Sequence, residues 1–196
     1  MPTYCADIVS IFDLKVDAVV NPINCKGAMG KGLALEFKKR FPLNFSYYKK
    51  QCQVGAVKIG QMLVYKTMLV KRSPRLIINF PTKNDWRDPS DMVYITEGLK
   101  ELLKVCIAEK VTNIAIPKIG CGLGGLDWED VYPEIRNVFQ AHPEIQVYLW
   151  GRKPVGVTID VYSDLTPDFP ELHDQLSQLP ERSHQPFDDD ICDGRY

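Results

Sequence analysis

Strand-length apolar segments alternate with helix-length segments along the first 150 residues of the chain. Six runs rich in Val, Ile, Tyr and Phe predict strands, at residues 3–8, 17–21, 62–66, 76–80, 113–117 and 145–150. Several of them are almost wholly apolar, which is typical of strands in a sheet that is covered on both faces. Four segments with helical patterns lie between them, at residues 30–41, 44–52, 90–109 and 127–139. The alternation predicts an α/β fold in which a mixed sheet lies between layers of helices.

The predicted helix over 90–109 has one apolar face. Its apolar residues recur at helical spacing on that face: Ile95, Leu99, Leu102, Leu103 and Cys106. Ser90 is a predicted N-cap, because a serine hydroxyl accepts a hydrogen bond from the free N–H groups of a first helical turn. Asp127 is the equivalent predicted N-cap of the helix over 127–139.

Length and composition predict one soluble domain. The chain has 196 residues, of which 45% are hydrophobic, so it is long enough for one well-packed core and short for two. No apolar run approaches the roughly 20 residues that cross a bilayer, and the amino terminus lacks the features of a signal peptide. We therefore expect a cytoplasmic monomer without membrane contact. The six cysteines are scattered and none lies at zinc-finger spacing from a histidine, so no disulfide framework, metal or cofactor is expected.

The net charge of -1 hides two regions of opposite sign. Residues 154–196 carry ten acids and two bases, whereas residues 1–153 carry 22 bases and 15 acids. We expect one domain over 1–165, in which the alternating residues of 155–161 form an edge strand. An acidic, proline-rich tail follows over 166–196 and is expected either to wrap over the domain or to be partly disordered. A basic body suits an anionic ligand or a nucleic acid.

One glycine-rich segment leads from a predicted strand into a predicted helix. This first glycine loop, residues 21–34, contains Gly27, Gly30 and Gly32. Glycines let a phosphate approach the main chain closely, and N–H groups at the start of a helix attract anions. The Gly-x-x-Gly-x-Gly spacing matches neither the Walker nor the Rossmann pattern. A tight crossover alone would account for only one of the three glycines.

A second glycine loop, residues 116–128, also follows a predicted strand and precedes a predicted helix. Ligands of open α/β sheets bind beyond the carboxyl ends of the strands, so the two loops are expected to face each other across one crevice. Together they are suited to a diphosphate. Cys121 lies in this loop, but no histidine is near it in sequence, and we interpret it as a small residue rather than a nucleophile.

These motifs resemble those of the macrodomains, a family that binds ADP-ribose. The resemblance covers about residues 3–150 and rests on the segment 6–8 and the two glycine loops, which occur in the family's order and distances. The segment 79–87 is similar to that of the DarG-type branch, which removes ADP-ribose from thymidine bases in DNA. The resemblance implies a three-layer α/β/α sandwich and an ADP-ribosyl glycohydrolase whose partners are ADP-ribose and single-stranded ADP-ribosylated DNA.

The resemblance also implies roles for individual residues. Asp7 would accept a hydrogen bond from the adenine amino group, and the N–H of Ile8 would bind the adenine ring. Lys83 corresponds to the catalytic lysine of the DarG-type branch. The residues implied to bind the rest of ADP-ribose come from the two glycine loops: Asn21, Asn24, Gly27, Met29, Gly30, Gly32, Pro117, Gly120, Cys121, Gly122, Leu123 and Gly124.

Two chemical roles are open for Lys83. A lysine amine can attack the anomeric carbon as a nucleophile if its pKa is lowered, or it can stabilise developing charge as an ammonium. The related glycohydrolases that clear ADP-ribose from glutamate side chains carry an aspartate where this chain has Gly124. That departure favours the DNA-type function.

Trp86 and Arg87 are candidates for contact with a base or a backbone phosphate, as in proteins that bind single-stranded nucleic acid. An ordinary hydrophobic lid and a surface charge are the alternative interpretation of these two residues. Two other functions also stay open. One is an ADP-ribose-binding module without catalysis, and the other is a hydrolase of ADP-ribosylated protein or of ADP-ribose 1''-phosphate. The presence of Lys83 favours catalysis.

Overall fold

The computed structural model describes residues 3–5, 10–67 and 74–151. The chain divides into two units, Met1–Val161 and Tyr162–Tyr196, and every described residue belongs to the first. Asp7, Ile8, the predicted edge strand over 155–161 and the predicted tail over 166–196 lie outside the described residues.

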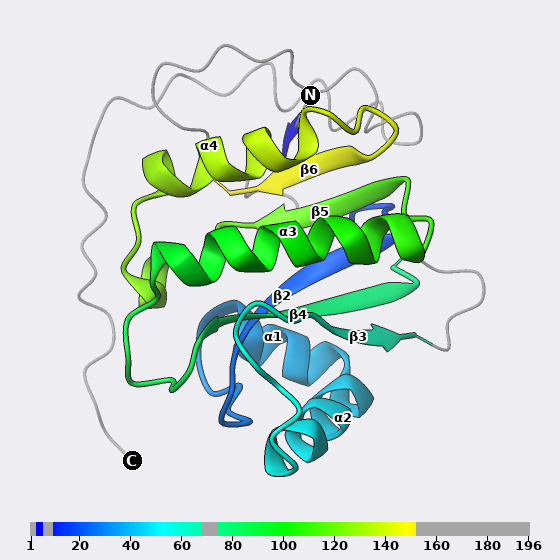
Figure 1. Ribbon diagram of the computed structural model, residues 1–196. Helices are drawn as coiled ribbons and strands as arrows, with labels where there is room; N and C mark the ends of the chain where they lie inside the picture. Colours follow the sequence, from blue (N-terminus) through cyan, green and yellow to red (C-terminus); the bar gives the residue numbers. More distant parts are fainter. Residues whose placement is uncertain (1–2, 6–9, 68–73, 152–196) are drawn as a thin grey trace, which may run out of the picture. The chain divides into compact units, whose positions relative to one another are not determined.

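The described part of the chain is built on a mixed six-stranded sheet with strand order β1-β6-β5-β2-β4-β3 (Figure 1). All neighbouring strands are parallel except β3 and β4, which are antiparallel. The mixed sheet predicted from the sequence is therefore confirmed. The strands are β1 Thr3–Cys5, β2 Ala18–Asn24, β3 Leu63–Lys66, β4 Leu76–Lys83, β5 Asn113–Pro117 and β6 Gln146–Trp150.

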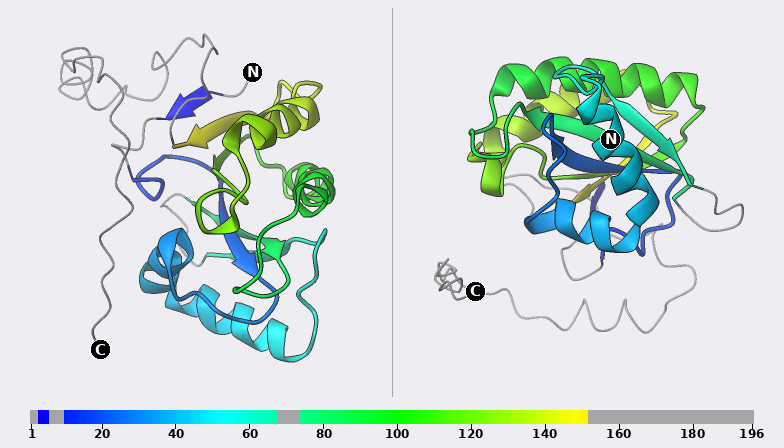
Figure 2. Two further views of the ribbon diagram at one scale, coloured as in Figure 1. Left: turned by 90° about the vertical axis from the view of Figure 1, so that its left-hand side faces the viewer. Right: turned by 90° about the horizontal axis from the view of Figure 1, so that it is seen from below.

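Two pairs of helices cover the two faces of the sheet, which confirms the three-layer sandwich. Helices α1 (Gly32–Arg40) and α2 (Pro42–Gln53) lie on one face, and α3 (Met92–Ala108) and α4 (Trp128–Phe139) lie on the other (Figures 1 and 2). The larger core lies under α3 and α4, and a smaller one, which includes Met29 and Tyr48, lies under α2.

Strands β2 and β4 are longer than the sequence predicts. The predicted ends, Asn21 and Phe80, each precede a proline, a residue that lacks the N–H that a strand ladder uses. The pairing nevertheless continues from Asn21 opposite Asn79 to Asn24 opposite Lys83, with a shift in register after Ile23. The extension carries Lys83 to the carboxyl end of β4, directly beside the first glycine loop.

Helix α3 has the predicted apolar face but not the predicted start. Ile95, Leu99 and Leu102 are fully buried, as expected. The N-cap is Asp91, whose carboxylate accepts a hydrogen bond from the Val93 N–H at 2.8 Å, so the assignment of Ser90 was wrong. The backbone N–H of Ser90 instead donates to the Gly124 carbonyl at 2.8 Å, and this contact draws Ser90 out of the helix toward the second glycine loop.

Asp127 is the N-cap residue of α4, as predicted, but its side chain makes no capping hydrogen bond. Its backbone carbonyl accepts hydrogen bonds from the N–H groups of Asp130 and Val131. The sequence therefore predicted the position of the cap correctly, but the expected capping hydrogen bond to the Asp127 side chain does not form.

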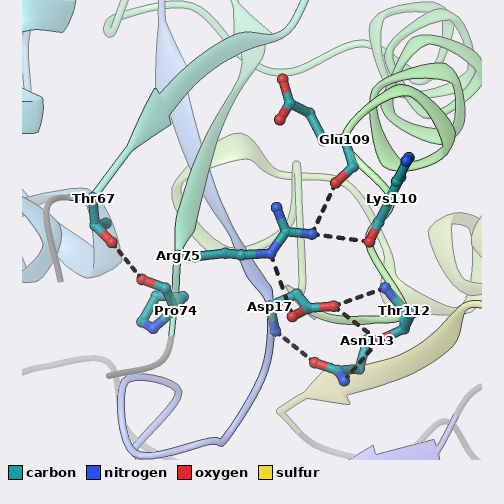
Figure 3. A network of polar contacts seen from close by, with 8 residues as sticks. All are labelled: Asp17, Thr67, Pro74, Arg75, Glu109, Lys110, Thr112 and Asn113. Carbon is teal, nitrogen blue, oxygen red and sulfur yellow. Dashed lines mark hydrogen bonds and ion pairs between the residues drawn. The ribbon is translucent and has the colours of Figure 1, made fainter. Parts of the chain in front are cut away.

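The amino ends of the three central strands are joined by side chains (Figure 3). Asp17 before β2 accepts hydrogen bonds from the N–H and hydroxyl of Thr112 before β5, at 2.8 and 2.9 Å. Arg75 before β4 pairs with the Asp17 carboxylate at 3.4 Å and donates to the carbonyls of Glu109 and Lys110. We call Asp17, Arg75 and Thr112 the amino-end network.

Within the described ranges, no helix is long and apolar enough to cross a membrane. The cysteines whose side chains are described are all free: Cys25, Cys52, Cys106 and Cys121.

Candidate functional site

A cavity of about 1030 Å³ opens at the carboxyl ends of the central strands. It lies between the two glycine loops and the end of β4, and Trp150 and Gly151 also line it. Ligands of open α/β sheets bind at this edge. The predicted site residues that line the cavity are Asn24, Gly30, Gly32, Lys83, Trp86, Arg87, Pro117, Gly120, Cys121, Gly122, Leu123 and Gly124.

The side chain of Asn24 organises the first glycine loop. Its Oδ1 accepts hydrogen bonds from the N–H groups of Lys26 and Ala28 at 2.9 and 3.3 Å, and its Nδ2 donates to the Ala28 carbonyl at 2.6 Å. The buried Tyr48 hydroxyl of α2 donates to the Asn24 carbonyl at 2.7 Å and accepts from the Gly27 N–H at 3.1 Å. The turn is therefore fixed from within and from α2.

Three predicted loop residues do not line the cavity. Asn21 is fully buried and its Nδ2 donates to Asn79 Oδ1 at 2.8 Å, on the face of the sheet that α2 covers. Met29 is buried in the small core beside Tyr48. Gly27 faces α2, where a Cβ would lie 3.5 Å from Cys52 Cβ. All three support the loop from behind.

Glycines of the second glycine loop are required by backbone conformation and by space. Gly120 has a φ of +75°, and a Cβ on it would lie 2.7 Å from Leu126 Cδ1 and 2.9 Å from Ile95 Cδ1. Gly124 ends the short 3-10 helix Gly122–Gly124, and a Cβ there would lie 2.5 Å from Ser90 Oγ. Side chains are excluded at both positions, so the main chain itself forms the cavity wall.

Cys121 lines the cavity as a protonated thiol. Burial raises its pKa to about 11, which favours the thiol over the more nucleophilic thiolate at neutral pH. The interpretation of Cys121 as a small residue rather than a nucleophile agrees with this environment.

Lys83 is a buried amine held by backbone carbonyls. Its side chain is 8% exposed, and Nζ donates to the carbonyls of Leu123 at 2.8 Å and Asp88 at 2.7 Å. Burial lowers the pKa of the amine, and the negative charge of Asp88 opposes this shift only in part. Lys83 thus joins the end of β4 to the second glycine loop and carries an amine that loses its proton more readily than a surface lysine.

The cavity is positively charged. Its described lining contains Lys31, Lys83, Arg87 and Lys118 but no aspartate, glutamate or histidine. No cluster of three or more metal-binding side chains occurs in the described ranges. The lining therefore favours an anionic ligand held by backbone N–H groups and cations.

Trp86 and Arg87 lie at the rim of this cavity. Trp86 is 59% exposed, and the Arg87 guanidinium lies 5.4 Å from the centre of its ring. Arg87 also pairs with Asp85 through two hydrogen bonds of 2.9 Å, and these hydrogen bonds hold the pKa of Asp85 well below its usual range. Trp86 thus presents an exposed aromatic ring at the cavity rim, beside an arginine that Asp85 holds in place.

Sequence reasoning missed Lys31 and Lys118 in the lining and Tyr48 behind it. The two lysines are adjacent to glycine-loop residues already singled out, so their position in the loops was an available signal. Tyr48 is separated from Asn24 by 24 residues, and no local pattern connects them.

The fold and the site together define an α/β domain with a cation-lined cavity between two glycine loops. Residues 20–135 match the family model described as Macro domain. This chain belongs to the macrodomain family.

Relatives place the chain more closely within that family. It is 45% identical over 134 residues to the DNA ADP-ribosyl glycohydrolase of Mycobacterium tuberculosis, a match that covers 68% of this chain and 38% of that protein. The chain therefore spans about two fifths of this curated relative. The solved macrodomain of Mycobacterium tuberculosis DarG is similar with a TM-score of 0.75 and 41% identity, over 78% of this chain and 99% of that one.

A third relative was solved with a ligand. Thermosipho africanus DarTG in complex with ADP-ribose is similar with a TM-score of 0.67 and 28% identity. The match covers 77% of this chain and 41% of that chain.

Proposed function

We propose that this chain hydrolyses the N-glycosidic bond between ADP-ribose and thymidine bases in single-stranded DNA. The observation that carries the proposal is Lys83, a buried amine in a cation-lined cavity whose described walls contain no carboxylate. Similarity to DNA ADP-ribosyl glycohydrolases supports the same conclusion.

ADP-ribose would be held mainly by main-chain groups. The two glycine loops offer backbone N–H groups to the diphosphate, and Lys31 and Lys118 add positive charge from either side. The relative solved with ADP-ribose supports this choice of ligand. The predicted adenine contacts of Asp7 and Ile8 remain part of the proposal.

Lys83 would act at the far ribose as a nucleophile. Its lowered pKa increases the fraction of neutral amine, which can attack the anomeric carbon. The bond from that carbon to the lysine nitrogen forms while the bond to the base breaks. The base nitrogen keeps the electron pair and takes up the proton that the attacking amine loses. Water then displaces the lysine, which releases ADP-ribose and restores the amine.

The deciding experiment compares substrates side by side. ADP-ribosylated single-stranded oligonucleotide and ADP-ribosylated protein are incubated with the protein, and released ADP-ribose is measured. We expect release from the oligonucleotide and at least about tenfold slower release from the protein. Release from protein alone would overturn the DNA assignment, and micromolar ADP-ribose binding without release from either substrate would identify a binding module.

The Lys83→Arg variant separates the two roles of the amine. A guanidinium keeps the positive charge but stays protonated and does not attack carbon. We expect Lys83→Arg to bind ADP-ribose and to be inactive. Retained activity would assign Lys83 an electrostatic role in place of the nucleophilic one.

A further inference from the structure

The two helical layers of the described domain carry opposite charge. Residues 18–66, which include α1 and α2, contain nine lysines and arginines and a single acid, Glu36. Residues 84–151, which include α3 and α4, contain six bases and eleven acids. Helices α1 and α2 lie on one face of the sheet and α3 and α4 on the other (Figure 2), so the five bases within α1 and α2 lie on one face: Lys38, Lys39, Arg40, Lys49 and Lys50.

Part of the basic layer is neutralised locally. Lys39 pairs with Glu36, Arg40 with Asp13 and Lys66 with Glu109. The remaining lysines that are exposed and form no ion pair or ring contact with any described residue are Lys26, Lys31, Lys49, Lys50 and Lys58. These five charges, and that of Lys38 over the uncharged Phe45 ring, carry the excess that an external anion would meet.

Two of these lysines, Lys26 and Lys49, lie between the cavity rim and the surface of α2. The Cys25 N–H donates to the Asn84 carbonyl at 3.0 Å, so Lys26 lies beside the segment that holds Trp86. The charge of Lys26 contributes to the lowered pKa of Asp85, which agrees with this position. Gly27 in turn lies against α2, where its Cβ would be 3.7 Å from Lys49 Cγ. Trp86, Lys26 and Lys49 thus follow one another from the rim onto α2.

We propose that the DNA strand leaves the cavity past Trp86 and continues over Lys26 and Lys49 on the α1–α2 layer. This inference rests on the proposed function and adds the surface that holds the rest of the substrate. Lysines on this path bind successive phosphates, and the exposed indole stacks on a base next to the modified one. Stacking needs an unpaired base, so the surface fits a single strand rather than a duplex.

The test removes two charges from each face. Lys26→Ala/Lys49→Ala removes them from the proposed path, and Lys100→Ala/Lys104→Ala removes the same charge from the exposed side of α3. The probe is unmodified single-stranded oligothymidylate, whose affinity is measured by fluorescence anisotropy over a range of salt concentrations. We expect the first variant to bind at least about tenfold more weakly at low salt. The slope of log affinity against log salt should fall by about 1.4, because each phosphate contact on a single strand contributes about 0.7.

The α3 variant should keep the affinity and the slope of the unaltered protein. Trp86→Ala should weaken binding about tenfold with an unchanged slope, because stacking involves no counterion release. Equal affinity of the two double variants would overturn the proposed path. Tighter binding of the matching duplex would overturn the single-strand assignment.

Activity distinguishes failure of this inference from failure of the proposed function. ADP-ribose release is measured from ADP-ribosylated oligonucleotide and from ADP-ribosyl-thymidine, which has no strand to bind. We expect Lys26→Ala/Lys49→Ala to lower kcat/KM for the oligonucleotide about tenfold and to leave the nucleoside reaction unchanged. An unaltered protein that releases ADP-ribose from neither substrate would overturn the function, whereas an equal loss on both substrates would overturn the strand path.

Discussion

The two ends of the central strands are held together by different kinds of contact. At the amino end, Asp17, Arg75 and Thr112 join β2, β4 and β5 through side-chain hydrogen bonds and an ion pair (Figure 3). At the carboxyl end, the glycine loops surround a cavity of about 1030 Å³, and the Lys83 amine donates to the main-chain carbonyls of Asp88 and Leu123. One end is filled by side chains, while the other leaves its main chain open to a ligand.

We therefore expect stability to depend mainly on the amino end of the sheet and function mainly on its carboxyl end. Contacts at the amino end lie far from the cavity, so changing them should lower the free energy of unfolding without altering the chemistry. Changes at the carboxyl end should affect binding or catalysis first. The following substitutions test that separation.

The largest effect is expected from Lys83→Ala. Removing the amine should slow ADP-ribose release from ADP-ribosylated DNA by a thousandfold or more, roughly 4 kcal/mol of transition-state stabilisation. ADP-ribose binding, measured by calorimetry, should stay within a few-fold, because the glycine loops hold the diphosphate. An unchanged rate would exclude Lys83 as the catalytic group.

Asp17→Ala should have the converse effect at the other end of the sheet. It removes hydrogen bonds from Thr112 and the ion pair with Arg75, at a cost of about 2 kcal/mol in the free energy of unfolding. Urea unfolding measures this loss, and kcat/KM well below the melting temperature should stay within twofold. A large loss of activity in the still-folded variant would mean that the two ends are coupled.

Gly120→Ala should affect both properties to a smaller extent. A side chain at a φ of +75° is strained, and its Cβ would meet Leu126 and Ile95 at 2.7 and 2.9 Å. We expect ADP-ribose to bind about tenfold more weakly and the free energy of unfolding to fall by about 1–2 kcal/mol.

Gly55→Ala is the matched control for this change. Gly55 has a φ of +69°, with nothing within 4 Å of its Cβ position, and it does not line the cavity. In the control, backbone strain should lower the free energy of unfolding by about 1 kcal/mol, and the affinity for ADP-ribose should not change. Equal loss of affinity in both variants would attribute the effect to general destabilisation.

The smallest effect is a pH dependence at the amino end. Burial raises the pKa of Asp17, but hydrogen bonds from Thr112 and the charge of Arg75 together bring it below its ordinary value. A carboxylate with a lowered pKa stabilises the fold above the unfolded-state pKa of about 3.9, and this contribution is lost as the pH falls through the folded-state value. The urea midpoints of the unaltered protein and Asp17→Asn should therefore converge below about pH 4. A constant difference down to pH 2 would contradict this assignment.

Much of the fold followed from local patterns. The apolar runs located all six strands, and the helical spacing of Ile95, Leu99 and Leu102 identified the buried face of α3. The ends of elements were less predictable, because they depend on long-range partners. The predicted cap Ser90 instead donates its N–H to the carbonyl of Gly124, 34 residues away, and Asp91 caps α3.

The sequence predicted about as much of the site as of the fold. The glycine spacing and the segment around Lys83 identified the cavity walls, since glycines tolerate conformations and close contacts that other residues do not. The direction of each loop side chain was not encoded locally. Asn24 lines the cavity, whereas Asn21 and Met29 turn toward α2, because the strand alternates faces and the Tyr48 hydroxyl fixes the turn.

The sequence by itself determined the α/β alternation, the two glycine loops and the presence of a lysine, Lys83, after the strand that became β4. Only the tertiary structure decided the environment of that amine. Lys83 is buried and held by the carbonyl of Leu123, 40 residues further along the chain, and burial is what lowers its pKa. The tertiary structure also decided that α1 and α2, with their five lysines and arginines, lie together on one face of the sheet. Both properties depend on the spatial packing of segments that are distant in sequence, and local residue patterns do not specify that packing.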